Sequence, residues 1–426
     1  MISPAPLPVR TDPVARARAA AARRVMEQVL RRVDVDLRTE EDERRRADAG
    51  TGQDARPVGR PAVVLHEPER FYARLGASHK VAVGEGYTEG DWSPAPGHDL
   101  AAVLLPFAQR LGDGLPRPLR ALRHLADQAL PRSTRNTLDG SRRNIEAHYD
   151  LSNEMFAAFL DASMTYSCAL FDEDAPWHDQ TLEDAQLRKV DAALDRARVQ
   201  EGSRLLEIGT GWGTLAVRAA QRGAQVRTIT LSGEQAAWAG KRVAEAGLAD
   251  RVEVRVQDYR EVDGEFDAVV SVEMVEAVGE EFWPTYFGSI DARLAPGGTA
   301  VVQAITLPHE RYLSTRNTYG WIQKYIFPGG ALPSLDAMER ICTRHTSLRL
   351  GEAHVFGQHY AETLRRWRTS FGEAWPRIVE LGFDERFRRI WEFYLAYCQA
   401  GFTAGTIDVG QVVLHRPVRG PVAAGR

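Results

Sequence analysis

The chain has 426 residues, of which 44% are hydrophobic and 26% charged, a balance typical of a globular protein and not of a disordered or membrane-spanning chain. Its net charge of −4 argues against a dedicated nucleic-acid binder, because such proteins are usually basic. The three scattered cysteines exclude a disulfide framework and a zinc cluster, and the first residues lack the apolar core of a secretory signal, so we expect a cytoplasmic protein without a metal site.

The first 130 residues predict a leading segment and a small domain. Residues 14–38 are rich in Ala and Arg and favour a helix, whereas the charged stretch that follows, up to Arg60, predicts a polar linker. Beyond it the runs AVVLH and KVAVGEGY alternate like strands, and 99–110 predicts a helix. We interpret 1–60 as a flexible or helical segment and 61–130 as a small α/β domain, for which lipid binding is a hypothesis.

A basic stretch follows this domain. Between residues 116 and 143 leucines are interspersed with seven arginines, at positions 117, 120, 123, 132, 135, 142 and 143. Such a pattern suits an anionic membrane surface, to which each arginine near it adds on the order of 1 kcal/mol. A solvated helix between domains has the same pattern, so both interpretations stay open.

From Ser203 onward strands and helices alternate regularly. Five strand-like runs, SRLLEIG, AQVRTIT, RVEVRVQ, FDAVVSV and TAVVQAI, are separated by helical stretches. This rhythm predicts a parallel, doubly wound α/β sheet. After Ile305 we expect a helix-rich insertion at 310–345, a strand near 348–355, further helices and a last strand at 408–414.

The most specific local motif is EIGTGWG, which begins at Glu207 and directly follows a predicted strand. Its glycines, Gly209 and Gly211 among them, suit a sharp turn and a close approach of the backbone to a ligand, although an ordinary turn or a dinucleotide site would also contain glycines. Three features favour S-adenosylmethionine. Glu207 can order the loop and the ammonium group of the cofactor, the next strand ends at Thr230 without the acidic residue that a dinucleotide ribose usually meets, and the run QDY around Asp258 can read an adenine amino group.

These segments resemble the cyclopropane-fatty-acid synthase family, which includes mycolic-acid cyclopropane synthases and methyltransferases that make methyl-branched fatty acids. The matching runs lie in the family's order over residues 148–415: HYDLSNEMF, MTYSCALF, LLEIGTGWG, ITLSGEQ, QDYR, EMVEAVG, YIFPGGALPS, HYAETLRRW and AGFTAGTIDVGQVVL. The resemblance implies a class I S-adenosylmethionine-dependent methyltransferase fold, which is a Rossmann-like, doubly wound and mostly parallel sheet with helical insertions, in a catalytic domain over 131–426.

The resemblance also implies a reaction, the methylation of a carbon–carbon double bond in an unsaturated acyl chain of a phospholipid. The alkene takes the sulfonium methyl, a carbocation forms on the neighbouring carbon, and a bound bicarbonate ion removes a proton. The implied location of the protein is the cytoplasm, where it would bind peripherally to the inner face of an anionic membrane. A separate flavin-dependent reductase and a second copy of the chain are further partners that we consider.

The family's site residues carry over to the matching positions. The implied catalytic and bicarbonate-binding residues are Glu276, Tyr360, Cys168, Gln303 and Ile305. The implied cofactor contacts, besides Glu207 of the motif, are Tyr149, Tyr166, Ser167, Gly209, Gly211, Thr230, Leu231, Gln235, Asp258 and Tyr259. Tyr166, Trp212, Tyr319 and Tyr325 are aromatic residues that could stabilise a carbocation or simply line the protein core.

Two positions depart from the pattern of many family members. Those members have His where this chain has Ala277, and His on the fifth strand where this chain has Gln303. A glutamine can donate to an oxyanion but cannot relay a proton near neutral pH. Glu273 is a second nearby carboxylate that could substitute in part. We favour a methylene product, reduced later by a flavin enzyme, over a cyclopropane.

Two other functions stay open. A small-molecule N- or O-methyltransferase would keep the cofactor site but would not need the bicarbonate-binding residues. A non-catalytic lipid-binding relative would keep the fold without binding S-adenosylmethionine.

Overall fold

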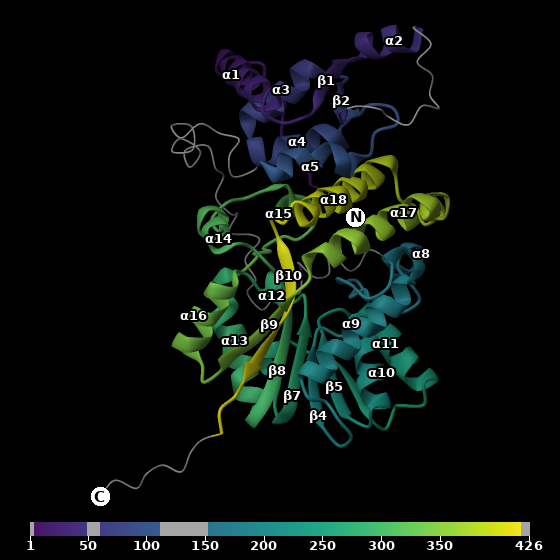
Figure 1. Cartoon of the computed structure of the whole chain (residues 1–426), viewed down its shortest axis with the longest axis vertical. Helices are drawn as coiled ribbons and strands as arrows, with labels where there is room; N and C mark the ends of the chain where they lie inside the picture. The colour runs from purple at the N-terminus through teal and green to yellow at the C-terminus, as the bar shows by residue number, and fades with distance from the viewer. Residues whose placement is uncertain (1–3, 49–59, 111–151, 419–426) are drawn as a thin grey trace, which may run out of the picture. The chain divides into compact units, whose positions relative to one another are not determined.

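The computed structural model describes residues 4–48, 60–110 and 152–418, and every structural statement below concerns these residues (Figure 1). The basic stretch 116–143 and Tyr149, both singled out in the sequence, lie outside the described residues. The described part of the chain divides into two compact units. One has its residues within 1–131, 317–328 and 375–406, and the other within 132–316, 329–374 and 407–426.

The second unit is built on a seven-stranded sheet with the order β6-β5-β4-β7-β8-β10-β9. The first five of these strands run parallel, whereas β10 is antiparallel to both of its neighbours. The strands are β4 (Arg204–Ile208), β5 (Gln225–Thr230), β6 (Val252–Val256), β7 (Phe266–Val272), β8 (Leu294–Thr306), β9 (Arg349–Val355) and β10 (Asp408–His415). All seven were expected, and β4 lies where the strand order reverses, which is where ligands bind in open α/β sheets.

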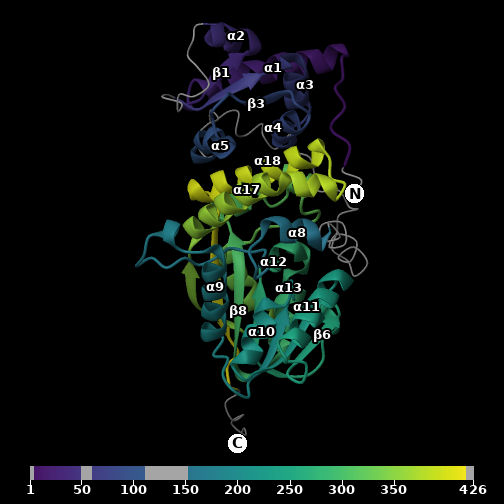
Figure 2. The ribbon, with the colours of Figure 1, turned by 90° about the vertical axis from the view of Figure 1, so that its right-hand side faces the viewer.

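Helices cover both faces of this sheet, so its central strands are buried on both sides (Figure 1). Successive side chains of β4 point to opposite faces of the sheet, because Leu205 packs in the apolar cluster on one face and Leu206 in the cluster on the other. One face carries α9 (Leu182–Arg196), α10 (Thr214–Gln221) and α11 (Gly233–Glu245), the layer that faces the viewer in Figure 2. The other face carries α12 (Val275–Val278), α13 (Trp283–Arg293) and α16 (Leu335–His345).

Among the residues that the structure describes, the remaining helices of the second unit are short, apart from α17. They are α8 (Asn153–Phe159), α14 (His309–Thr315) and three 3-10 turns, η2 (Trp177–Asp179), η3 (Tyr259–Glu261) and η4 (Glu280–Phe282). The helix α17 (Gly357–Glu380) contributes its first part, up to Ala374, to this unit.

The first unit has a three-stranded sheet of β1 (Asp36–Thr39), β2 (Ala62–Leu65) and β3 (Trp92–Pro94). Its described helices are α1 (Pro13–Leu30), α2 (Glu40–Asp48), α3 (Pro68–Ala77), α4 (His79–Thr88), α5 (Leu100–Gln109), α15 (Trp321–Tyr325) and α18 (Glu385–Thr403). None of the described helices is long and apolar enough to cross a membrane. Tyr325, one of the aromatic residues that we considered for stabilising a carbocation, lies in this unit. Its hydroxyl donates to the buried Glu85 carboxylate at 2.8 Å.

Two sequence expectations for the first unit were wrong. The charged stretch after Thr39 is partly helical, because α2 has acidic residues in its first turn, basic residues in its last, and Glu40–Arg44 and Glu41–Arg45 pairs one turn apart. The run KVAVGEGY lies in α4 and is not a strand. Almost all of this helix is buried, so its alternating residues do not mark one buried face and one exposed face.

Gly84 explains why α4 can be so buried. A Cβ atom at this position would lie 2.4 Å from Cδ1 of Trp321 and 2.7 Å from Cε1 of Phe393. We therefore expect Gly84→Ala to lower the free energy of unfolding by about 1–3 kcal/mol, although alanine usually stabilises a helix. Gly240 in α11 has nothing within 4 Å of its would-be Cβ, so Gly240→Ala is the matched control and should stabilise. Denaturant titration of both variants tests this, and equal effects of the two would contradict it.

Candidate active site

The glycine motif forms the turn between β4 and α10. Gly209, Gly211 and Gly213 all have positive φ angles, of +100°, +51° and +90°. A Cβ atom on Gly209 would lie 2.6 Å from Cγ of Met274, and one on Gly213 would lie 3.0 Å from Cβ of Ala239. The loop therefore needs glycine both for its backbone angles and for close packing.

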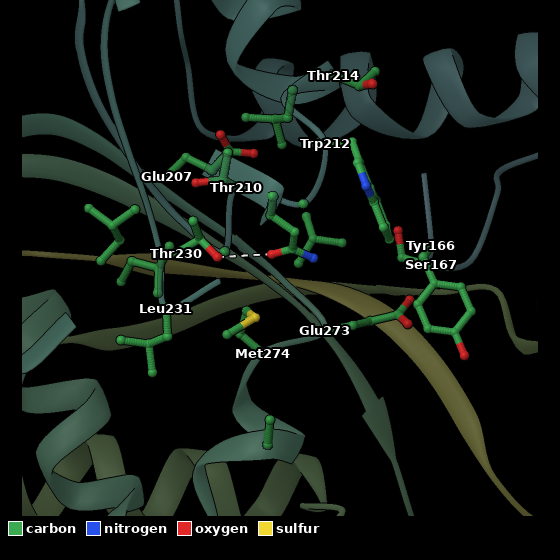
Figure 3. Close-up of a pocket in the computed structure, with 18 of the residues that line it drawn as sticks. Tyr166, Ser167, Glu207, Thr210, Trp212, Thr214, Thr230, Leu231, Glu273 and Met274 are labelled. Carbon is green, nitrogen blue, oxygen red and sulfur yellow. Dashed lines mark hydrogen bonds between the residues drawn. The ribbon is translucent and has the colours of Figure 1, made fainter. Parts of the chain in front are cut away.

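A pocket opens at the carboxyl ends of β4, β5, β6 and β7 (Figure 3). The cofactor residues expected from the sequence that the structure describes all line it: Tyr166, Ser167, Glu207, Gly209, Gly211, Thr230, Leu231, Gln235, Asp258 and Tyr259. Thr230 donates its hydroxyl to Oε1 of Gln235 at 2.9 Å (Figure 3). The Asp258 carboxylate accepts two hydrogen bonds from the guanidinium of Arg260, at 2.6 and 2.7 Å, and one from the Arg260 backbone N–H at 2.9 Å. These bonds hold the carboxylate in place.

Glu207 gives the pocket a buried carboxyl group. Its Oε2 atom is buried and has no hydrogen-bond partner among the described residues. Burial raises the pKa of Glu207 to about 8. A cationic ligand group would satisfy the Oε2 atom and favour the charged carboxylate, so the residues present fit S-adenosylmethionine.

Lys189 is a pocket residue that the sequence did not single out. It lies on α9, only 1% exposed, and its Nζ donates to Oγ of Ser167 at 2.6 Å. Burial lowers its pKa to about 8, although the negative charge of Glu273 acts in the opposite direction. A signal was present in the sequence, because Lys189 is spaced by four residues from Ala185 and Ala193 and so falls on the apolar face of the helix.

The catalytic residues expected from the resemblance gather at the same edge of the sheet, around two carboxyl groups. Glu273, directly after β7, lines the pocket and accepts hydrogen bonds from the backbone N–H of Cys168 (2.9 Å), from Nε2 of Gln303 (2.9 Å) and from the hydroxyl of Tyr360 (2.7 Å). Figure 3 shows its side chain pointing to the side of the pocket where Tyr166 lies. Burial raises the pKa of Glu273, and these three donors oppose the rise.

Glu276 lies one helical turn further on, in α12. Its Oε1 atom accepts a hydrogen bond from the backbone N–H of Ile305 at 2.5 Å, and its buried Oε2 atom has no partner among the described residues. Burial, and secondarily the negative charge of Glu273, raise the pKa of Glu276 to about 8. At neutral pH the group is therefore mostly a neutral carboxylic acid.

Cys168 contributes its backbone N–H to this cluster, and not its thiol. The thiol is fully buried, donates to the carbonyl of Ala169, and has a pKa raised well above its usual range by burial. A thiol held in this state is a poor nucleophile.

The strand order of the sheet, the glycine loop after β4 and the pocket beside it together define a class I S-adenosylmethionine-dependent methyltransferase. The chain matches the family model for mycolic acid cyclopropane synthetase over residues 136–412, and it belongs to this family.

Two curated relatives cover most of the chain. It is 46% identical over 418 residues to the tuberculostearic acid methyltransferase UfaA1 of Mycobacterium tuberculosis, covering 97% of this chain and 95% of that protein. It is 33% identical over 372 residues to the cyclopropane-fatty-acyl-phospholipid synthase of Escherichia coli K12, covering 86% of this chain and 91% of that protein. The crystal structure of the mycolic acid cyclopropane synthase CmaA1 complexed with SAH and CTAB superposes with a TM-score of 0.58 at 30% identity, covering 64% of this chain and 98% of that one. The protein is thus a methyltransferase of the cyclopropane-synthase type.

Proposed function

We propose that this enzyme transfers the methyl carbon of S-adenosylmethionine to the double bond of an unsaturated fatty acyl chain in a phospholipid. The observation that carries the proposal is a hydrogen-bonded carboxylate, Glu273, at the wall of the cofactor pocket. An alkene has no acidic proton to lose before it is methylated, so a proton must leave a carbon atom afterwards, and a base is needed beside the methyl donor. The names of the two curated relatives support a fatty acyl substrate.

The residues of the chain would divide the work as follows. When bound, S-adenosylmethionine supplies an electrophilic methyl group. Lys189 orients Ser167 at the wall of the pocket, and Glu207 presents its free oxygen to the cationic ligand. The ring of Tyr166 stacks on Trp367, with centroids 5.2 Å apart, and its π face can stabilise a positive charge on the substrate without itself being methylated as readily as an amine.

We propose a methylene-branched product, which a separate flavin-dependent enzyme would reduce, with a cyclopropane as the alternative outcome. Expression in a host rich in oleoyl phospholipid, followed by mass spectrometry of its fatty acids, should show acyl chains heavier by one CH₂ group. Nuclear magnetic resonance then separates the two products, because only a methylene branch has olefinic protons. An N- or O-methylated metabolite with unchanged acyl chains would instead identify a small-molecule methyltransferase. Calorimetry that detects no binding of S-adenosylmethionine would favour a non-catalytic relative.

We also propose that the enzyme works at the inner face of an anionic membrane, through the basic stretch 116–143. Charge reversal of Arg117, Arg120 and Arg123 should weaken binding to anionic liposomes at low salt, since each arginine contributes on the order of 1 kcal/mol. Reversal of the exposed arginines Arg198, Arg344 and Arg377 is the matched control. Cosedimentation at low and high salt measures the difference, and equal binding by the two variants would refute this docking surface.

A further inference from the structure

Glu273 occupies the position at which the resemblance places a bicarbonate ion. The backbone N–H of Cys168, the amide of Gln303 and the hydroxyl of Tyr360 are all engaged by its carboxylate. Oε1 accepts from the first two donors and Oε2 from the third. The residues present therefore do not fit a separate ion among these three donors.

The backbone directs the Glu273 side chain into this position. Its φ angle is +53°, in the left-handed region that residues other than glycine seldom adopt, at a cost on the order of 1 kcal/mol. The conformation is held by a hydrogen bond from the Glu273 N–H to the carbonyl of Gln303 at 2.8 Å. Uncommon backbone conformations of this kind persist where surrounding structure enforces them, and they cluster at active sites.

A chain of hydrogen bonds fixes which end of the Gln303 amide faces Glu273. Arg196 can only donate, and it donates to Oε1 of Gln411 at 2.9 Å. The Gln411 amide nitrogen is therefore turned to Oε1 of Gln303, to which it donates at 3.1 Å. This leaves Nε2 of Gln303 as the donor to Glu273. A relay of three residues, on α9, β10 and β8, therefore orients a single N–H toward the carboxylate.

The two neighbouring carboxyl groups have different surroundings. Glu273 accepts three hydrogen bonds and lies in the field of the buried Lys189 ammonium, whereas Glu276 accepts one backbone hydrogen bond at Oε1 and has an Oε2 without a partner among the described residues. Hydrogen bonds from donors stabilise the ionised form. A proton shared by this pair therefore resides on Glu276 and leaves Glu273 as the carboxylate.

We propose that Glu273 is the catalytic base of this enzyme and that turnover needs no bicarbonate. The inference rests on the proposed alkene methylation. In that reaction the alkene electron pair forms the new carbon–carbon bond as the sulfur–methyl bond breaks, which leaves the substrate as a carbocation. A C–H bond of the added methyl group then breaks, and its proton passes to an oxygen of Glu273. The C–H electron pair closes a cyclopropane ring or, once a hydride has moved to the neighbouring carbon, a methylene double bond. The proton finally leaves to water.

The experiment measures acyl methylation by the full-length enzyme, with S-adenosylmethionine and dioleoyl phosphatidylglycerol vesicles, in buffer purged of carbon dioxide and in the same buffer with added bicarbonate. The wild type should turn over equally in both. Glu273→Gln should lose at least about a hundredfold in turnover in either buffer, which is the usual effect of losing a positioned base. Glu273→Gly opens the three-donor site, so added bicarbonate should restore its turnover. Glu352→Gln, at an exposed position on β9, is the matched control.

Thermal unfolding and calorimetric binding of S-adenosylmethionine show whether each variant is folded. A folded Glu273→Gln protein that keeps more than about a tenth of the wild-type turnover would overturn the assignment, and so would a wild type that needs bicarbonate. A wild type that methylates no acyl chain in either buffer would instead count against the proposed function.

Discussion

Replacing Gly209 with alanine should weaken binding of S-adenosylmethionine by at least about a hundredfold, or roughly 2.7 kcal/mol. The residue has a φ angle of +100°, beyond the left-handed region that other residues sometimes adopt, and its added Cβ would lie 2.6 Å from Cγ of Met274. The loop would have to move away from Met274, and the backbone that lines the pocket would move with it. Isothermal titration calorimetry measures the loss of affinity.

Gly247 supplies the control for backbone strain alone. It also has a positive φ angle, +69°, but nothing lies within 4 Å of its would-be Cβ, and it is not among the residues that line the pocket. Gly247→Ala should cost about 1 kcal/mol of stability and leave the cofactor affinity unchanged. If Gly209→Ala bound S-adenosylmethionine as tightly as Gly247→Ala does, the loop would not be positioned as we describe.

The cofactor pocket could be predicted from the sequence because its residues follow strands. Glu207, Thr230 and Asp258 stand at or just after the ends of three successive parallel strands, and such ends meet at one edge of a sheet. In contrast, the run KVAVGEGY could not be assigned from its pattern. Its Gly84 accommodates the aromatic rings of Trp321 and Phe393, which are more than two hundred positions away, and no local window contains that information.

The arrangement at Glu273 also exceeds what a sequence pattern can show. The residue was visible as a nearby carboxylate, but its left-handed φ angle and the orientation of the Gln303 amide depend on contacts between β7, β8 and β10. Lys189 is similar, because its partner Ser167 lies on a different segment and only the fold brings the two together. The resemblance implied roles for Cys168, Gln303 and Tyr360, whereas only the structure shows that all three donate to Glu273.

Glu276→Gln should make the cofactor-free protein progressively more stable than the wild type as the pH rises. Burial raises the folded-state pKa of Glu276 to about 8 from its ordinary value of 4.5. Between these values the folded wild type binds more protons than the unfolded chain, so its free energy of unfolding falls as pH rises, by at most about 1.4 kcal/mol per pH unit. Glutamine stays neutral, and its Oε1 can still accept the hydrogen bond from the Ile305 N–H.

Urea titrations at about pH 5, 7 and 8.5 measure this difference, which should grow to a few kcal/mol at the highest pH. The wild-type protein contains a second such group, Glu207, so its own pH dependence cannot be assigned to one residue, whereas the difference between variant and wild type can. Glu352→Gln, at an exposed position, should shift stability equally at all three pH values. A pH-independent gap for Glu276→Gln would mean that Glu276 is ionised in the folded protein. Glu273 and Glu276 would then both be charged. The proposed assignment, with the proton on Glu276 and the catalytic carboxylate at Glu273, would be wrong.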